Sequence, residues 1–305
     1  MSIPDGGGVR AVVITWNPDL KRLNEAVAAL RLQVRGITIV DNGSLNGDEV
    51  TASFAADEAV DVMRLPDNFG IGAALNVGVD VALRESPTWV LTMDQDTLVG
   101  AGAVDGILAE LSTLDERSVE KCAIVALRPH PQPASIWLTR YADSLLVIRD
   151  LDGFVERRGV ITSGNLVRAD VAQQIRYNEA LFIDQVDFDF CFSLRHRGYS
   201  VLQQKVVTMD HVLGERYDDV EKVHPYENAQ RLYYIVRNST FMVLRRRLLV
   251  RFYLAQVVVF CGAFVSINGA TSIPLCAMVV IRALSDAIVG RLGRREYPLL
   301  SKGRR

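Results

Sequence analysis

VRAVVITWNPDLKRLNEAVAALRLQVRGITIVDNGS, residues 9–44, is the stretch that decides the fold. Its first apolar run, residues 9–15, is rich in β-branched residues and stops at the turn signal Asn17-Pro18, which predicts a buried strand. Apolar residues then recur every three or four positions and predict a helix, at Leu20, Leu23, Val27 and Leu30. A second strand over residues 36–40 completes a β-α-β unit, which is typical of a parallel sheet.

The same alternation continues outward from this unit. A short strand over residues 60–65, the turn PDNFG (66–70), a helix over 71–84 and an apolar strand over 89–93 are predicted. These elements predict an α/β domain over residues 1–220, built on an open, mostly parallel sheet flanked by helices. Four polar strings follow strands or lead into helices, at the edge where such sheets bind ligands: TWNPD (15–19), DNGS (41–44), DNFGIGAALN (67–76) and MDQD (93–96).

The character of the chain changes over residues 221–305, which we predict to be a helical, membrane-associating region. Residues 252–281 carry no charge, although Asn268-Gly269 and Pro274 interrupt them, so one membrane span and a pair of interfacial helices both remain open. From Arg245 onward there are eleven Lys/Arg and two Asp/Glu, a local charge of +9, which leaves −11 for the first 244 residues. This distribution argues against nucleic acid as a partner and for contact with anionic lipid.

The four cysteines are far apart and form no CxxC pair, so we expect them to be packing residues of a protein in a reducing compartment. The first ten residues, MSIPDGGGVR, lack an apolar stretch of signal-peptide length. Catalysis is therefore expected at the cytoplasmic face of the cell membrane.

Two carboxylates, Asp94 and Asp96, flank Gln95 directly after the predicted strand 89–93. Oxygen ligands of this kind suit Mg²⁺ or Mn²⁺ bound together with a diphosphate, although a solvated loop or a helix cap would look the same. Gly70 and Gly72 precede a helix and could let backbone N–H groups approach an anion, or form an ordinary turn. The string is not GxGxxG, which disfavours a nicotinamide dehydrogenase.

Further candidate groups lie in LFIDQVDFDFCFSLRHRGYSV, residues 181–201. On a helix Asp184 and Asp187 would share a face, and apolar neighbours would raise the pKa of a carboxyl toward that of a general base, while Asp189 and surface capping remain alternatives. Asp41, after the second strand, could accept hydrogen bonds from a base or ribose, or cap a turn. His211 could be a metal ligand or a structural residue.

In their order along the chain, these strings resemble the inverting glycosyltransferases of family 2, which have the GT-A fold, and look most like the bacterial rhamnosyltransferase branch. The resemblance covers about residues 11–238. It is carried by VVITWNP, IVDNGS, LPDNFGIGAALNVGV, WVLTMDQD, ITSGNLVR, FIDQVDFDFCFSLRHRGY, DHVLGE and RLYYIVRN.

The resemblance implies a role for each matching residue. Nucleotide-sugar contacts fall to Thr15, Asn17, Asp41, Asn68, Gly70, Asn76, Asp94 and Gln95, and the metal-diphosphate to Asp94 and Asp96, with His211 completing the metal site in some relatives. Asp187 matches the catalytic base, and Ser163, Gly164 and Asn165 lie on the acceptor side. Arg231, Tyr233, Arg237 and Asn238 match a late string whose role the sequence does not give.

The resemblance also implies a reaction. We expect inverting transfer of one sugar, L-rhamnose from dTDP-β-L-rhamnose, to a polyprenyl-linked or polysaccharide acceptor, because no QxxRW string typical of processive synthases follows. UDP-galactofuranose or another UDP-hexose is the alternative donor. A non-catalytic nucleotide-sugar-fold protein that binds membrane or a partner is the alternative class, and a homo-oligomer remains open. Val186 stands where many relatives have Glu, which keeps Asp184 and Asp189 as rival bases.

Overall fold

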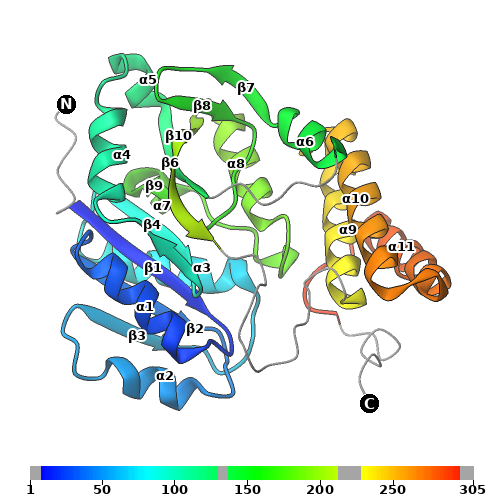
Figure 1. Cartoon of the computed structure of the whole chain (residues 1–305), viewed down its shortest axis with the longest axis horizontal. Helices are drawn as coiled ribbons and strands as arrows, with labels where there is room; N and C mark the ends of the chain where they lie inside the picture. The colour runs from blue at the N-terminus through cyan, green and yellow to red at the C-terminus, as the bar shows by residue number, and fades with distance from the viewer. Residues whose placement is uncertain (1–7, 130–136, 212–227, 296–305) are drawn as a thin grey trace.

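The computed structural model describes residues 8–129, 137–211 and 228–295 and builds them around one ten-stranded mixed sheet (Figure 1). The strand order is β3-β2-β1-β4-β9-β6-β10-β8-β7, and β5 pairs with β10 off this path. The strands are β1 (Val9–Thr15), β2 (Gly36–Asp41), β3 (Val60–Arg64), β4 (Trp89–Asp94), β5 (Thr97–Val99), β6 (Cys122–Pro129), β7 (Val147–Asp150), β8 (Phe154–Arg157), β9 (Asn165–Arg168) and β10 (Ser200–His211).

Helices cover both faces of this sheet and form a separate layer at one end. They are α1 (Leu20–Arg31), α2 (Gly47–Phe54), α3 (Ile71–Leu83), α4 (Ala103–Leu111), α5 (Glu116–Lys121), α6 (Trp137–Ser144), α7 (Ala169–Gln174), α8 (Val186–His196), α9 (Ala229–Leu244), α10 (Val250–Asn268) and α11 (Ile273–Ile288), with short 3-10 helices η2 (Glu179–Leu181) and η3 (Ala270–Ser272). The α/β class predicted from the sequence is confirmed.

The predicted parallel half of the sheet is present, since β1 pairs in parallel with β2 and β4, and β2 pairs in parallel with β3. Beyond β4 the sheet is mixed, because β9 runs antiparallel between β4 and β6. The strand β10 again runs parallel to β6. The start of β9 and the ends of β1–β4, β6 and β10 therefore meet at one edge, which is the edge on which the polar strings were predicted to gather.

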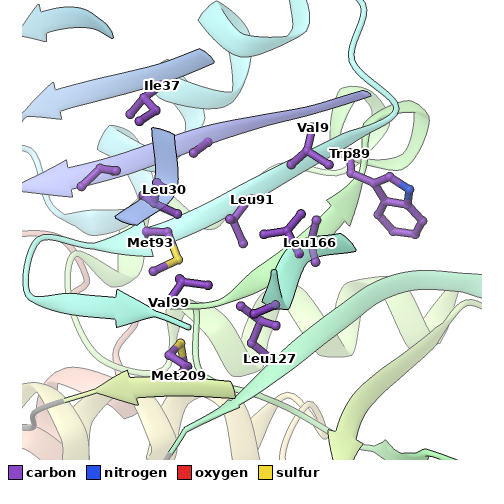
Figure 2. Close-up of a cluster of buried hydrophobic side chains, with 14 of the residues drawn as sticks. Val9, Leu30, Ile37, Trp89, Leu91, Met93, Val99, Leu127, Leu166 and Met209 are labelled. Atoms are coloured by element: carbon purple, nitrogen blue, oxygen red, sulfur yellow. The ribbon is translucent and has the colours of Figure 1, made fainter. Parts of the chain in front are cut away.

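The strands of the parallel half are apolar on both faces because helices cover both. Val9, Ala11 and Val13 of β1 belong to the core under α1, α2 and α4, and Figure 2 shows Val9 in this cluster beside Leu91 and Leu166. The alternating residues of β1 point to the other core, which α3, α7 and α8 cover. Packing of this kind holds the polar edge rigidly.

The uncharged run 252–281 forms two helices, because Gly269 takes a φ of +78° and ends α10. Both helices, Val250–Asn268 and Ala270–Ile288, have the length and composition of a membrane span, with mean hydropathies of 1.8 and 1.5. They lie with α9 at the end of the molecule remote from β3 (Figure 1). A core that includes Tyr233, Phe264 and Val279 joins the three helices.

All four cysteines are free, and three of them are buried, Cys122, Cys191 and Cys276. These three are packing residues as predicted, and Cys276 belongs to the core between α9 and α11. Cys261 is only partly buried.

Candidate active site

The loops after β1 and β2 are joined by a polar cluster around Asp41. Thr15 Oγ1 donates to Asp41 Oδ1 at 3.4 Å, and Ser44 Oγ also bonds to that oxygen. Ser44 Oγ accepts from the backbone N–H of Asn17 at 2.7 Å, and Asn17 holds a left-handed backbone with a φ of 47°. Asp41 Oδ2 is buried and accepts no hydrogen bond from the described residues, while Arg64 Nε lies 3.9 Å from it. A base or ribose hydroxyl would satisfy this oxygen.

The glycine turn before α3 is pinned from two sides. Asn68 Oδ1 accepts from Asn42 Nδ2 at 3.0 Å and from the N–H of Gly70 at 2.9 Å, which closes the turn. Gly70 has a φ of +91°, and a Cβ there would lie 2.5 Å from the carbonyl oxygen of Phe182. The same carbonyl accepts from the N–H of Ile71 at 2.7 Å. The turn predicted to hold the donor is thus in contact with the loop that precedes α8.

Asn76 lies one turn further into α3 and faces inward. Its Oδ1 accepts from the N–H of Tyr177, and its Nδ2 donates to the Tyr177 carbonyl and to Glu179 Oε1, at 3.0, 3.0 and 2.8 Å. The side chain is buried. The structure therefore places Asn76 in a contact between α3 and the segment before α8, apart from Asp41 and Asn68.

The turn between β4 and β5 carries Asp94 and Asp96 and is held by neighbouring elements. Gln95 Oε1 accepts from the N–H of Trp16 at 2.8 Å, which joins the turn to the residue that follows β1. Arg22 Nε of α1 donates to the carbonyl of Asp96 at 3.0 Å. Both carboxylate residues remain partly exposed. The backbone is fixed while the two acids face the edge of the sheet.

The predicted acceptor-side residues lie beside this turn because β9 pairs with β4. Ser163 is buried, accepts from the N–H of Asp94 at 3.1 Å and donates to Thr97 Oγ1 at 2.9 Å. Gly164 takes a φ of +84°, where a Cβ would contact Met209. Asn165 Oδ1 is buried and has no hydrogen-bond partner among the described residues. Ser163 therefore supports Asp94, and Asn165 offers an acceptor atom.

The three acids of residues 184–189 have different partners. Asp184 precedes α8 in a left-handed conformation (φ 60°), so the prediction that it shares a helix face with Asp187 is wrong. Arg231 Nη2 lies 3.3 Å from Asp184 Oδ1, and Arg247 Nε lies 2.6 Å from Asp189 Oδ1. Asp187, in the first turn of α8, has no basic partner among the residues that the structure describes.

The pKa of Asp187 is raised to about 7, first by burial and then by the charges of Asp184 and Asp94, against a hydrogen bond from the N–H of Phe188. The effect of Asp94 shows that the end of β4 and the start of α8 are close in space. The pKa values of Asp184 and Asp189 are also raised by burial, but Arg231 and Arg247 lower them again. A carboxyl with a pKa near neutrality suits a general base.

The residues present fit a hard divalent cation held with a diphosphate. Asp94 and Asp96 offer carboxylate oxygens, and Mg²⁺ needs only one or two of these beside phosphate oxygens and water. No group of three or more possible His, Cys, Asp or Glu ligands occurs among the described residues. The backbone of His211 pairs with Thr97, directly after Asp96, but the His211 side chain lies outside the described part of the structure.

Comparisons with known proteins agree with this geometry. A family model described as glycosyl transferase family 2 matches residues 11–119. The dTDP-rhamnosyl transferase RfbF of Shigella flexneri is 26% identical over 243 residues, which are 78% of this chain and 80% of that protein. Residues 11–119 therefore carry a domain similar to glycosyl transferase family 2, and the chain is a glycosyltransferase.

Solved glycosyltransferase structures share the fold. The structure of S. aureus TarS 1-349 has a TM-score of 0.51 at 13% identity and covers 93% of this chain and 81% of its own. GalNAc-T7 with UDP, GalNAc and Mn²⁺ has a TM-score of 0.55 at 14% identity and covers 78% of this chain, which spans half the length of GalNAc-T7. At these identities the likeness concerns the fold alone.

The structure adds residues of this glycosyltransferase that the sequence analysis did not select. Arg64 ends β3 beside Asp41, and Trp16 follows β1 with 54% of its surface exposed. Their positions at carboxyl strand ends could have identified them. Arg237 and Asn238 were noticed without a role, and both are fully buried against the loop before α8.

Asp187→Asn is expected to stabilise the folded enzyme at alkaline pH. Because burial raises the folded pKa of Asp187 above its unfolded value, the folded state binds more protons between about pH 4 and 7, and the wild type loses stability as the pH rises through that window. The variant escapes this loss. Melting temperatures at pH 5 and pH 8 should show an advantage for the variant that grows with pH.

Asp115→Ala is the control with the opposite sign. Hydrogen bonds from Ser118 lower the Asp115 pKa and cap α5, so this variant should be less stable than the wild type by a similar amount at pH 5 and pH 8 and approach it only below about pH 4. A melting advantage for Asp187→Asn that shrinks from pH 5 to pH 8 would contradict the raised pKa of Asp187.

Proposed function

We propose that this glycosyltransferase moves a single L-rhamnosyl residue from dTDP-β-L-rhamnose to an acceptor hydroxyl, with inversion, at the cytoplasmic face of the cell membrane. The observation that carries the mechanism is the separation of roles among the carboxylates. Asp184 and Asp189 are paired with arginines, while Asp187 has no basic partner among the described residues and has a pKa raised by burial. Rhamnose as the transferred sugar is supported by the name of the RfbF relative, which is 26% identical to this chain.

The transfer is a single displacement. Ionised Asp187 takes the proton of the acceptor hydroxyl as that oxygen forms a bond to the anomeric carbon, and the bond from this carbon to the diphosphate oxygen breaks with its electron pair. Mg²⁺ or Mn²⁺ at Asp94 and Asp96, when bound, offsets the charge on the departing diphosphate. Attack from the side opposite the leaving group inverts the anomeric configuration.

The nucleotide is proposed to lie over the ends of β1, β2 and β3. Asp41 Oδ2 provides the buried acceptor, and Thr15 and Ser44 fix the carboxylate orientation through Oδ1. The glycine turn at Gly70 brings the donor close to the loop before α8, where Asp187 begins its helix. Asn165, one strand from Asp94, is proposed to face the acceptor.

The C-terminal helices are proposed to rest on the membrane. Leu254 and Val258 of α10 and Ile281 of α11 are 55%, 59% and 68% exposed, although a soluble surface disfavours such residues in groups. Arg245, Arg246, Arg251 and Arg282 are exposed close to these apolar helices in the sequence. An apolar surface with basic neighbours fits an interface beside anionic headgroups.

Asp187→Asn should lower kcat by about 10²-fold or more while the donor KM changes little, because the amide keeps the shape of the carboxylate but accepts no proton. Transfer from dTDP-rhamnose is measured alongside Asp184→Asn and Asp189→Asn. Asp184→Asn and Asp189→Asn should keep more activity than Asp187→Asn, because the acids at these two positions form ion pairs with arginines. Near-normal turnover by Asp187→Asn would assign the base elsewhere.

Nucleotide diphosphates should raise the melting temperature only with divalent metal, in the order dTDP above UDP, GDP and ADP. A ligand that binds the folded state alone stabilises it, and the metal offsets repulsion between the diphosphate and Asp94 and Asp96. Asp94→Ala should lose the metal-dependent part of the rise in melting temperature. The control is Asp105→Asn, which removes an exposed acid of α4 and should keep that part. Transfer from UDP-galactofuranose and not dTDP-rhamnose would overturn the donor assignment.

Replacing Leu254, Val258 and Ile281 together by Ser should weaken cosedimentation with phosphatidylglycerol vesicles by about tenfold or more, since each buried methylene contributes about 0.8 kcal/mol to interfacial binding. Leu32→Ser is the matched control and should leave vesicle binding unchanged. Leu32 is 90% exposed but lies at the end of α1, outside the C-terminal helices. Donor hydrolysis should be unchanged in both. If the wild-type protein does not cosediment with anionic vesicles, the proposed membrane contact is wrong.

A further inference from the structure

The loop that leads into α8 holds an unfavourable backbone conformation. Phe182, Asp184 and Gln185 have φ values of 67°, 60° and 66°, although none is glycine. L-residues avoid this region because the Cβ approaches a backbone oxygen. Three such residues in four positions persist only where surrounding contacts determine the conformation, and such strain tends to occur at functional sites.

Two residues of α9 provide those contacts. Asn238 Nδ2 lies within hydrogen-bond distance of three loop carbonyls, those of Leu181, Ile183 and Asp184, at 2.9, 2.7 and 2.9 Å. Arg237 Nη2 donates to the Leu181 carbonyl at 3.0 Å. The carbonyls that the strained loop turns inward are thus satisfied by side chains 54 to 57 positions later in the sequence.

The amide of Asn238 is itself oriented. Arg237 Nε donates to Asn238 Oδ1 at 2.8 Å, which leaves Nδ2 directed at the loop. Arg237 Nη1 donates to the carbonyl of Gly293 at 2.8 Å, and its guanidinium lies 4.8 Å from the ring centre of Tyr234. Both side chains are fully buried. The pair therefore behaves as one rigid unit with a single hydrogen-bonding arrangement.

The loop places Asp187 directly. Gln185 is the N-terminal cap of α8, and Asp187 is the second residue of that helix, so a change in the loop would move the start of the helix. On its other side the loop meets the glycine turn through the bond from the N–H of Ile71 to the Phe182 carbonyl. The loop conformation thus links the proposed base to the proposed donor turn.

We propose that Asn238, oriented by Arg237, is a positioning residue that holds Asp187 at its working distance from the donor, an inference that rests on the assignment of Asp187 as the base. The hydrogen bonds described for the two side chains go to the loop before α8, to Gly293 and to each other. Their action is to keep the carbonyls of Leu181, Ile183 and Asp184 turned toward α9, which fixes the first turn of α8.

The experiment compares Asn238→Ala with a matched control, Thr240→Val, in the full-length enzyme. Thr240 is also buried in α9, but its hydroxyl bonds to Tyr253 of α10 instead of the loop. Asn238→Ala should lower kcat about 10- to 100-fold, the range expected when a reacting group is displaced by about 1 Å. The Kd for dTDP with metal should change less than about threefold, and Thr240→Val should keep its kcat.

A double-mutant cycle with Asp187→Asn separates positioning from general damage. If Asn238 acts through Asp187, adding Asn238→Ala to Asp187→Asn should lower kcat no further. Equal losses in both backgrounds, or a fall in dTDP affinity that matches the fall in kcat, would overturn the proposal. Activity retained by Asp187→Asn alone would instead contradict the general base.

Arg237→Lys tests the same inference with the charge retained. Lysine has no Nε–H in the place of the guanidinium group, so the Asn238 amide loses the bond that orients it while a cation remains. We expect a smaller fall in kcat, again absent in the Asp187→Asn background. If Asn238→Ala does not fold, Arg237→Lys replaces it in the double-mutant cycle with Asp187→Asn. A kcat of Arg237→Lys equal to that of the wild type would then contradict the proposal.

Discussion

Burial of the Asp187 carboxyl at the start of α8 is the constraint on which the site depends. Burial disfavours ionisation of Asp187, and repulsion by the charges of Asp184 and of Asp94, at the end of a central strand, adds to this effect. A folded chain does not relax this repulsion by moving either residue, since Ser163 and the sheet hold Asp94 and the loop 181–185 holds Asp187. The unfavourable arrangement is therefore maintained by neighbours that have no part in the chemistry.

The arginines determine which acid remains reactive. Asp184 and Asp189 flank Asp187 in the same short segment and are also raised in pKa by burial, yet Arg231 and Arg247 favour their ionised forms. Both arginines come from α9 or the residues after it. The C-terminal part of the chain thus separates the three carboxyls into two ion-paired groups and one proposed base, which the local sequence 181–189 does not determine.

The sequence predicts what depends on local pattern and misses what depends on distant contacts. The strands β1 to β4 and the helix α3 follow from apolar periodicity, and the polar ends of the strands locate Asp41 and Asp94. The residue types of Asp184 and Gln185 give no sign of their left-handed conformations. The prediction that Asp184 and Asp187 share a helix face is therefore wrong. The antiparallel insertion of β9 depends on pairing across more than 70 residues.

The C-terminal helices are linked to the candidate site by contacts of the residues that follow α11. After α11 the chain returns to the segment before α8 and to the glycine turn: the N–H of Gly293 donates to the Ala180 carbonyl at 2.6 Å, and Arg294 lies 2.9 Å from Asp67. Arg237 reaches the Gly293 carbonyl from the other side. The exposed apolar helices thus connect, at their far end, to both loops that flank the proposed reaction centre. A surface that seats α10 and α11 would therefore also restrict those loops, which makes the membrane, in this proposal, part of the environment that holds the site.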